Sequence, residues 1–328
     1  MKLNLKTRGY GLAALLFLLG RYPVSWLLSG RRGKSLSDTD VADETGIFFK
    51  SPTGNVLFVQ TDGLAQDTTL VFIHGINSSR QQWQHQQQYF RRYYRLILID
   101  LPGHGRSPEP VDLSIKSLAI DLSHILTTMG IRQAILHGHS LGGMIIQEYW
   151  KLKLSPTPKA IILQSCSYTN PLKAMPISPI PHLLQWPVII PALRYISSKT
   201  SAFTALGYAS YSSGISALFY RFLLFSGGQS AATLRKMADF AKRVKAKTSA
   251  EALLHAFAFD AGSALKTIHV PCLIIAARED RLIATEVARR LHKQIKDSEL
   301  VIVDGGHQSL AEFPEQTNRA VRSFLLKQ

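Results

Sequence analysis

AILHGHSLGGMIIQEYW, residues 134–150, places Ser140 between an aliphatic run and a stretch in which apolar residues recur at helical spacing. Gly138, Gly142 and Gly143 surround the serine, so the pattern predicts a strand, a tight turn and a helix with almost no loop between them. Glycine suits so sharp a bend because a Cβ atom there would clash with neighbouring backbone. Such a turn lifts the serine hydroxyl above the sheet, beside the N–H groups of the first helical turn. A plain helix N-terminus capped by Ser140 fits these residues as well.

The length and composition describe a folded chain with a large core. The chain has 328 residues, of which 46% are hydrophobic and 18% charged, and this balance excludes wholesale disorder. Such a length predicts one large domain or a domain with an insertion. The two cysteines, Cys166 and Cys272, lie at or in aliphatic segments, which favours two buried free thiols over a disulfide and leaves the compartment open.

Strand-like and helix-like segments alternate from residue 46 onward. Residues 46–50 and 55–60 flank the turn SPTGN and predict an antiparallel hairpin. The later runs that predict strands are almost purely aliphatic; they are TTLVFIHG (68–75), RLILID (95–100), AIL (134–136), KAIILQS (159–165), CLIIAA (272–277) and ELVIVD (299–304). Such uniformly aliphatic strands belong in a parallel sheet covered on both faces. The sequence therefore predicts an α/β fold with a mostly parallel central sheet flanked by helices.

Chemically useful side chains follow the carboxyl ends of three of these strands. Ser140, Asp280 and His307 come in that order, each just past a separate strand, and functional residues collect at this edge of open α/β sheets. A serine hydroxyl needs an imidazole to take its proton, and the imidazole needs a carboxylate to fix its tautomer. A helix over about residues 282–295 and one strand fit between the aspartate and the histidine, which predicts adjacent loops for them. The pattern indicates serine hydrolase chemistry.

These motifs resemble those of the α/β-hydrolase family, in particular its serine esterases and lipases. The resemblance covers about residues 46–327, with a gap in the middle. It rests on GHSLGG, on HG at 74–75, on DLPGHGRS at 100–107, and on the late aspartate and histidine. The resemblance implies an α/β-hydrolase fold with a helical cap insertion.

The resemblance also implies roles for individual residues. Ser140 corresponds to the nucleophile, His307 to the general base and acid, and Asp280 to the carboxylate that orients the histidine. The oxyanion hole corresponds to the backbone N–H groups of Ile76 and Leu141. The supporting positions around these groups are His74, Gly75, Gly138 and Gly142. Haloalkane dehalogenases and epoxide hydrolases of this fold use an aspartate nucleophile, so the serine at this position excludes them.

Other polar residues near these positions have simpler interpretations. Asp304 and Asp260 are rival carboxylates, but Asp304 comes at a strand end directly before the histidine, and we favour Asp280. His139 is expected to pack or to form hydrogen bonds. His137 and His139 form an H-x-H pair without a third ligand at zinc-site spacing. No strand leads into a dinucleotide-binding or phosphate-binding loop, so we predict neither a metal nor a cofactor.

The sheet pattern stops for about ninety residues in the second half of the chain. In the family this position holds a helical cap over the active site, and Pro171–Ser230 has only four charged side chains, all basic. The basic helix that follows carries Leu234, Met237 and Phe240 on one side. The cap is expected either to bury its apolar face on the enzyme body or to dock on lipid as well. The predicted units are a hydrophobic N-terminal segment (1–34), the hydrolase core (35–167 and 266–328) and the cap (168–265).

The N-terminus favours association with a membrane. Tyr10–Gly20 is apolar, but Arg21 and Pro23 interrupt it before the about 20 residues that a spanning helix needs. We expect an uncleaved anchor or interfacial helix; the alternatives are a cleaved signal, with a secreted or periplasmic protein, and a buried helix. Basic residues flank the segment on both sides, so no orientation is predicted. The net charge of +16 suits an anionic membrane surface, and no motif accompanies it that would predict nucleic-acid binding.

The predicted function is hydrolysis of carboxylic esters, acylglycerol-like or otherwise apolar in the acyl group, through an acyl-enzyme. A thioesterase, a lactonase or a C–C bond hydrolase uses the same three residues and stays an alternative. A catalytically silent scaffold that binds a ligand or partner is an alternative from another class. The intact set of Ser140, Asp280 and His307 disfavours the silent scaffold, and no oligomeric state is predicted.

Overall fold

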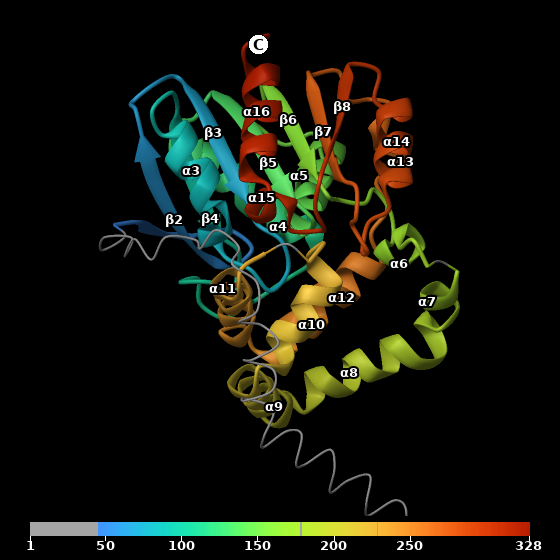
Figure 1. The fold of residues 1–328 in the computed structure, drawn as a ribbon. Coiled ribbons are helices and arrows are strands. Elements are labelled where there is room, and N and C mark those ends of the chain that lie inside the picture. The colour runs from blue at the N-terminus through green and yellow to red at the C-terminus, as the bar shows by residue number, and fades with distance from the viewer. Residues whose placement is uncertain (1–44, 178, 228) are drawn as a thin grey trace, which may run out of the picture.

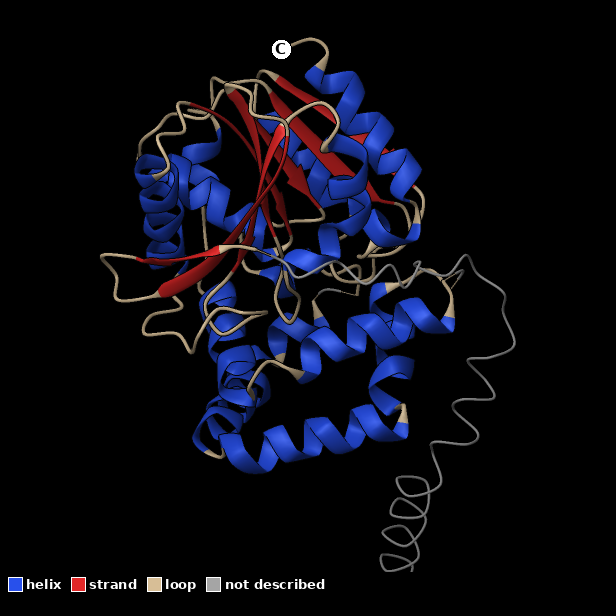
Figure 2. Ribbon diagram, turned by 90° about the vertical axis from the view of Figure 1, so that its left-hand side faces the viewer, coloured by secondary structure: helices blue, strands red, loops and turns tan. Residues whose placement is uncertain are grey.

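The computed structural model describes residues 45–177, 179–227 and 229–328. They form an eight-stranded sheet with helices on both faces and a further group of helices beyond one end of the strands (Figure 1, Figure 2). The strands are β1 (Ile47–Lys50), β2 (Val56–Gly63), β3 (Thr68–Ile73), β4 (Arg95–Asp100), β5 (Gln133–His139), β6 (Ala160–Gln164), β7 (Cys272–Ala277) and β8 (Ser298–Val303). The predicted α/β fold is confirmed.

The strands lie side by side in the order β1-β2-β4-β3-β5-β6-β7-β8. β1 and β2 form the predicted antiparallel hairpin, and β2 is also antiparallel to β4. The remaining neighbouring pairs are parallel. β5 therefore lies inside the sheet, and the loop that follows it opens at the same edge as the loops after β3, β7 and β8.

Helices cover both faces of the sheet because alternate apolar side chains of each strand point to opposite faces. The helices outside the β6–β7 connection are η1 (Arg80–Trp83), α3 (Gln84–Phe90), α4 (Ile115–Thr128), α5 (Leu141–Lys151), α14 (Thr285–Gln294), α15 (Ser309–Glu312) and α16 (Pro314–Leu325). Val71 and Leu136 pack in one apolar cluster with α4, α5 and α14. Leu70 and Phe72 pack in a second cluster with η1, α3 and α16.

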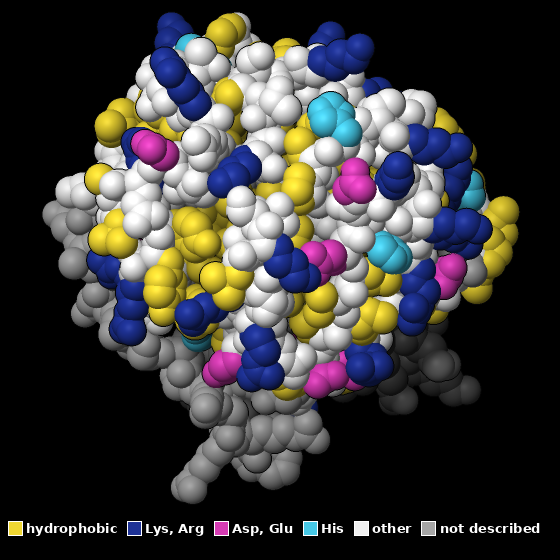
Figure 3. Space-filling model, turned by 90° about the horizontal axis from the view of Figure 1, so that it is seen from above, with side chains coloured by type: hydrophobic (Ala, Val, Ile, Leu, Met, Phe, Trp, Pro, Cys, Tyr) yellow, Lys and Arg dark blue, Asp and Glu magenta, His cyan; other side chains and the backbone are white. Residues whose placement is uncertain are grey.

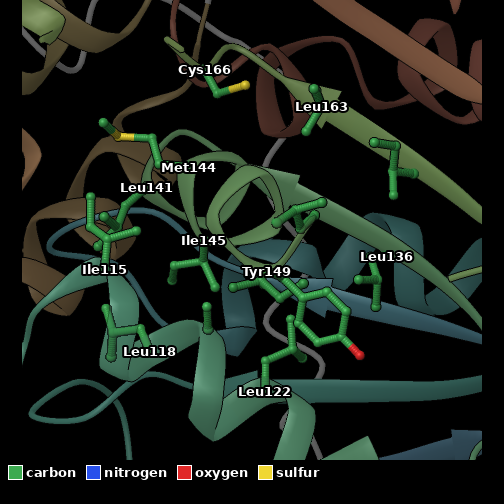
Figure 4. Packing of buried hydrophobic residues seen from close by; sticks show 14 of the residues in the cluster. Ile115, Leu118, Leu122, Leu136, Leu141, Met144, Ile145, Tyr149, Leu163 and Cys166 are labelled. Carbon is green, nitrogen blue, oxygen red and sulfur yellow. The ribbon is translucent and has the colours of Figure 1, made fainter. Parts of the chain in front are cut away.

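The packing of α4 on α5 fixes the helix that follows Ser140. In Figure 4, Ile115, Leu118 and Leu122 of α4 lie in one cluster with Ile145 and Tyr149 of α5. Each of these five side chains is at most 5% exposed. A close-packed interior resists displacement, so α5 forms a rigid support for its own N-terminal turn.

The connection between β6 and β7 is a helical insertion. Its helices are α6 (Pro171–Ala174), α7 (Ile180–Leu183), η2 (Gln185–Ile189), α8 (Ile190–Ser198), α9 (Thr200–Ser213), α10 (Ile215–Leu224), α11 (Ala231–Lys242), α12 (Ala246–Phe257) and α13 (Gly262–Leu265). Most of them lie beyond the end of the sheet opposite the C-terminus (Figure 1). The residues called the insertion below are 171–265.

The basic helix predicted after residue 230 is α11, and its apolar side faces the body of the protein. Leu234, Met237 and Phe240 are each at most 5% exposed. They pack in the same cluster as Trp83 and Phe225. This side of the helix is therefore covered by protein.

The prediction of membrane association through the N-terminus is contradicted by the structure. Among residues 45–177, 179–227 and 229–328, no helix is both long enough and apolar enough to cross a bilayer. A spanning helix needs about 20 residues, whereas the longest helices described, α4 and α9, have 14 residues each. The segment that carried the prediction, residues 1–34, lies outside the described part of the chain.

Charge is dispersed on the face opposite the insertion. Figure 3 looks onto this face, where Lys and Arg side chains alternate with acidic, histidine and apolar ones. Oppositely charged neighbours reduce the field of each basic group at a distance. The net positive charge of the chain is thus not gathered into a single basic patch on this side.

Candidate active site

Ser140 occupies a strained turn between β5 and α5. Its backbone has φ 52° and ψ −115°, a conformation that residues with a Cβ atom rarely adopt. A Cβ atom on Gly138 would lie 2.4 Å from the backbone of Gly142, and one on Gly142 would lie 2.2 Å from the carbonyl oxygen of Ile73. Both glycines are therefore required by close backbone approach, for the reason that the sequence indicated.

His307 and Asp280 meet on the loops after β8 and β7. His307 Nδ1 lies 2.9 Å from Asp280 Oδ2, and their side chains are 5% and 1% exposed. The other carboxylate oxygen accepts hydrogen bonds from the N–H groups of Leu282 and Ile283 at 2.8 and 2.9 Å. Because a carboxylate only accepts hydrogen bonds, Nδ1 carries a proton, and in the neutral form of the ring Nε2 therefore keeps its lone pair.

Glu279 joins the loops of the aspartate and the histidine next to this pair. Its carboxylate accepts a hydrogen bond from Gly305 N–H at 2.7 Å, and its own N–H donates to the Gly305 carbonyl at 2.9 Å. Two backbone positions are thereby held at a fixed separation. Together with the direct His307–Asp280 hydrogen bond, this link holds the two loops next to each other.

His139 connects the serine turn to the histidine loop. Its Nε2–H donates to the backbone carbonyl of His307 at 2.9 Å, and the two rings lie 4.9 Å apart between centroids. Burial, followed by the neighbouring His307, holds the pKa of His139 well below its usual value, so the ring is neutral. Since a carbonyl only accepts, the single proton is on Nε2. His139 thus has a hydrogen-bonding role, one of the two that the sequence suggested for it.

The His74–Ile76 loop lies against Ser140. A Cβ atom built on Gly75 would be 3.1 Å from Ser140 Cβ and 3.1 Å from His139 Nδ1. His74 Nε2 accepts a hydrogen bond from Leu101 N–H at 3.0 Å. The proton of the neutral ring is therefore on Nδ1, which donates to the carbonyl of Gly75 at 2.7 Å.

This last hydrogen bond orients the peptide unit that contains the Ile76 N–H. The carbonyl of Gly75 and the N–H of Ile76 belong to one planar trans peptide, so the two groups point in opposite directions. His74 fixes the carbonyl, and the N–H is thereby directed to the other side. Burial, with a further effect of nearby His104, lowers the pKa of His74 to about 3, which keeps the ring in this neutral form.

His104 and Asn77 continue the same network into the insertion. His104 Nε2 accepts from Asn77 N–H at 3.2 Å, and its Nδ1–H donates to the Pro102 carbonyl at 2.9 Å. The side-chain oxygen of Asn77 accepts from Ser249 Oγ of α12 at 2.5 Å. The loop after β3 is therefore held by the loop after β4 on one side and by the insertion on the other.

The rival carboxylates lie elsewhere. Asp304 contacts Arg278 and Gln316 at the surface, and Asp260 Oδ1 accepts from Gly262 N–H. His137 Nε2–H donates to the side-chain oxygen of Gln164 in the core. These three residues take part in local structure around the sheet.

Glu312 contacts the histidine loop and Ser226 contacts Glu312, and neither residue was predicted from the sequence. Glu312 accepts hydrogen bonds from Gly306 and from Ser226, a residue of the insertion. The two side chains are 86 positions apart in the chain. No local motif links them, and a single sequence carries no signal of this contact.

Comparison with known proteins gives one family for this arrangement. The model of the alpha/beta hydrolase family matches residues 70–320. A putative carbamate hydrolase, RutD of Pseudomonas syringae, is 29% identical over 272 residues, which cover 80% of this chain and 96% of that protein.

Solved structures have the same fold at low sequence identity. An esterase from Thermogutta terrifontis superposes with a TM-score of 0.70 at 19% identity, over 86% of this chain and 98% of that one. An enol-lactonase from Burkholderia xenovorans also has a TM-score of 0.70 at 19% identity, over 85% of this chain and 100% of that one. At this level of identity the likeness concerns the fold alone.

Proposed function

The chain belongs to the alpha/beta hydrolase family, and we propose from this that it is a serine hydrolase that cleaves carboxylic esters through an acyl-enzyme. Ser140 is the nucleophile, His307 the general base and acid, and Asp280 the orienting carboxylate. The observation that carries the proposal is the buried hydrogen bond of 2.9 Å between His307 and Asp280. It leaves the lone pair of His307 Nε2 free to take a proton.

The first half of the reaction forms the acyl-enzyme. His307 Nε2 takes the proton of Ser140 Oγ while Oγ attacks the carbonyl carbon of the ester, and the carbonyl electron pair moves onto oxygen. The backbone N–H groups of Ile76 and Leu141 stabilise this oxyanion. When the carbonyl reforms, the bond to the alcohol oxygen breaks, and the alcohol takes the proton from His307.

The second half returns the enzyme to its starting state. Water attacks the acyl carbonyl carbon, and His307 Nε2 takes a proton from it. The same two N–H groups stabilise the second oxyanion. Its collapse releases the carboxylic acid, and the proton passes from His307 back to Ser140 Oγ. Asp280 stays ionised throughout and stabilises the imidazolium form of His307.

The insertion supports an apolar substrate. Residues 171–230 hold only four charged side chains, so few groups there are suited to pair with a charged acyl chain. The insertion also contacts the loop after β3 through Ser249 and Asn77. We assign residues 168–265 to a cap that shapes the acyl or alcohol side of the site.

The experiment is replacement of the nucleophile. Ser140→Ala is expected to abolish ester hydrolysis and labelling by a fluorophosphonate, and adding His307→Ala is expected to cost almost nothing more, because triad residues act as a unit. Ser165→Ala is the matched control, since Ser165 also has a positive φ, of 46°, and a buried hydroxyl at the end of the next strand. Hydrolysis at the wild-type rate by Ser140→Ala would refute the mechanism.

Carbamate hydrolysis is a second candidate, favoured by the relative of Pseudomonas syringae that spans most of this chain. Carbamates have an acyl carbonyl that the same three residues can attack, but the amine substituent makes that carbonyl less electrophilic. A p-nitrophenyl ester and a p-nitrophenyl carbamate of equal size separate the two functions, because their leaving group is identical. A higher kcat/KM for the carbamate would replace the ester in our proposal. Thioesters and lactones belong in the same series.

A further inference from the structure

One short segment of the insertion lies against both loops of the candidate acid–base pair. This latch segment, Phe222–Ser226, is the last turn of α10 and the two residues after it. The carbonyl of Leu224 accepts a hydrogen bond of 2.9 Å from the N–H of Gln308, the residue after His307. A Cβ atom on Gly306, the residue before His307, would lie 2.7 Å from that carbonyl oxygen. His307 is thus flanked on both sides by positions that contact the insertion.

Glu312 reinforces this contact from the core. Its carboxylate accepts from Ser226 N–H, at 3.1 Å to each oxygen, and from Ser226 Oγ–H at 2.5 Å. The same carboxylate accepts from Gly306 N–H at 2.9 Å. Hydrogen bonds to an ionised acceptor are stronger than neutral ones. One side chain therefore joins the insertion to the residue that precedes His307.

The loop of the aspartate has a corresponding contact. Arg281, the residue after Asp280, donates from its guanidinium to the carbonyl of Phe222. Phe225 anchors the latch segment, because its side chain is 1% exposed and packs in the same apolar cluster as Leu310 of α15. The latch segment thus contacts the loops on either side of the His307–Asp280 hydrogen bond.

We propose that the latch segment sets the position of His307, and that Glu312 is the positioning residue that transmits it. The inference rests on the proposed function, because it concerns His307 as general base. His307 is therefore aligned best as the general base when the insertion is packed against the core. Substrate contacts with the insertion then raise kcat, in addition to any effect on binding.

The test compares two variants at the contact with two matched controls. Glu312→Gln keeps the shape but replaces one acceptor oxygen by a donor group, and Ser226→Ala removes only the hydroxyl on the insertion side. Asp304→Asn is the control on the histidine loop, since Asp304 contacts Arg278 and Gln316. Ser213→Ala is the control in the insertion, since the Ser213 hydroxyl bonds within α9.

We measure kcat and KM with a short p-nitrophenyl ester, and the rate at which a small fluorophosphonate labels Ser140. For Glu312→Gln we expect kcat and the labelling rate to fall about tenfold, with KM within about twofold of the wild type. A displacement of a catalytic group near 1 Å lowers the rate about 100-fold, and we expect a smaller effect here because the glutamine keeps one acceptor oxygen. For Ser226→Ala we expect a fall of about threefold, because its N–H still donates. The double variant should lose less than the product of the two single losses, since both changes act on one contact.

Three results of these measurements would overturn the proposal. If KM rises while the labelling rate is unchanged, the contact serves substrate binding and does not position His307. If the melting temperature falls while kcat and labelling stay at the wild-type level below the transition, the contact is structural only. Equal losses in the two controls would also count against it.

A spectroscopic readout separates this proposal from the proposed function. We expect the proton between His307 Nδ1 and Asp280 Oδ2 to give a far-downfield proton NMR resonance whose shift depends on the geometry of that hydrogen bond. We expect the resonance to move in Glu312→Gln and Ser226→Ala and to stay in the controls. An unmoved resonance would refute positioning by the latch segment even if Ser140→Ala behaves as expected. A moved resonance would support it even if Ser140→Ala kept its activity.

Discussion

A substitution at Gly75 is expected to displace the proposed oxyanion loop by a few tenths of an ångström. A Cβ atom at this position would lie 3.1 Å from Ser140 Cβ and from His139 Nδ1, whereas carbon atoms in ordinary contact are about 3.5–4.0 Å apart. In Gly75→Ala we therefore expect the loop and the serine turn to separate by about 0.4 Å. Gly75 φ is outside the left-handed region, so the substitution acts by contact and adds no backbone strain.

We expect this separation to weaken the proposed hydrogen bond from Ile76 N–H to the oxyanion. A bond of about 2.9 Å that lengthens by about 0.4 Å leaves the favourable range of about 2.7–3.2 Å for N–H···O bonds. Complete loss of one oxyanion donor costs on the order of 10²–10³ in kcat. We expect about a tenfold fall in kcat for Gly75→Ala and about a 100-fold fall for Gly75→Val, whose two methyl groups enlarge the displacement.

The assay is hydrolysis of a p-nitrophenyl ester at saturating concentration, with a thermal melt of each variant. Gly207→Ala is the control, because Gly207 lies in α9 and a Cβ atom there has no neighbour within 4 Å. Its kcat should equal that of the wild type, with a gain of at most about 1 kcal/mol in stability from helix propensity. Full kcat in a folded Gly75→Val would show that the 74–76 loop does not provide an oxyanion donor.

Three further predictions concern buried side chains around the site. His139→Phe should lower kcat at unchanged KM. His139→Gln should keep most of the wild-type kcat, because the glutamine Nε2–H can replace the donor to the His307 carbonyl. Equal kcat values in the two variants would contradict this role of His139. His74 and His137 have pKa values of about 3 in the folded protein because burial disfavours their charged forms. The unfolded chain therefore binds more protons than the folded one below about pH 6.5. Each of the two histidines should lower the unfolding free energy by about 2 kcal/mol at pH 5 relative to pH 8. Urea titrations at the two pH values should show this loss of stability, and in His137→Gln the loss should be smaller by about 2 kcal/mol. Burial raises the pKa of the Cys166 thiol to about 12. A disulfide reagent at pH 8 should therefore modify Cys166 in urea and leave it unmodified in the native protein. Rapid modification of Cys166 in the native protein would refute its burial.

The sheet could be predicted from the sequence because its signals are local. The aliphatic runs are as long as the strands, and the turn SPTGN lies between β1 and β2. The positions of Ser140, Asp280 and His307 after separate strands also follow from local pattern, once the strands are parallel. This is why three residues far apart in the sequence could be named before their spatial relation was known.

The contacts between distant segments could not be predicted in the same way. The carbonyl that accepts the His139 hydrogen bond is 168 positions away, and Ser226 is 86 positions from Glu312. For α11, the pattern of Leu234 and Met237 showed that one side must be covered, but it did not say by what. The structure gives the core as the covering surface. The expectation of membrane association rested on residues 1–34, and it was wrong.

The core and the insertion contribute different kinds of group to the contacts of the latch segment. The core contributes side chains, those of Glu312 and Arg281, while the insertion contributes mainly backbone groups, the carbonyls of Phe222 and Leu224 and the N–H of Ser226. Backbone groups are the same whatever residue carries them. The side chains of α8, α9 and α10 are therefore free to diverge under selection, or to be randomised in a directed-evolution library, while the attachment to the histidine loop is kept. Substrate preference and catalytic competence can in this way be inherited as separable traits within a single chain.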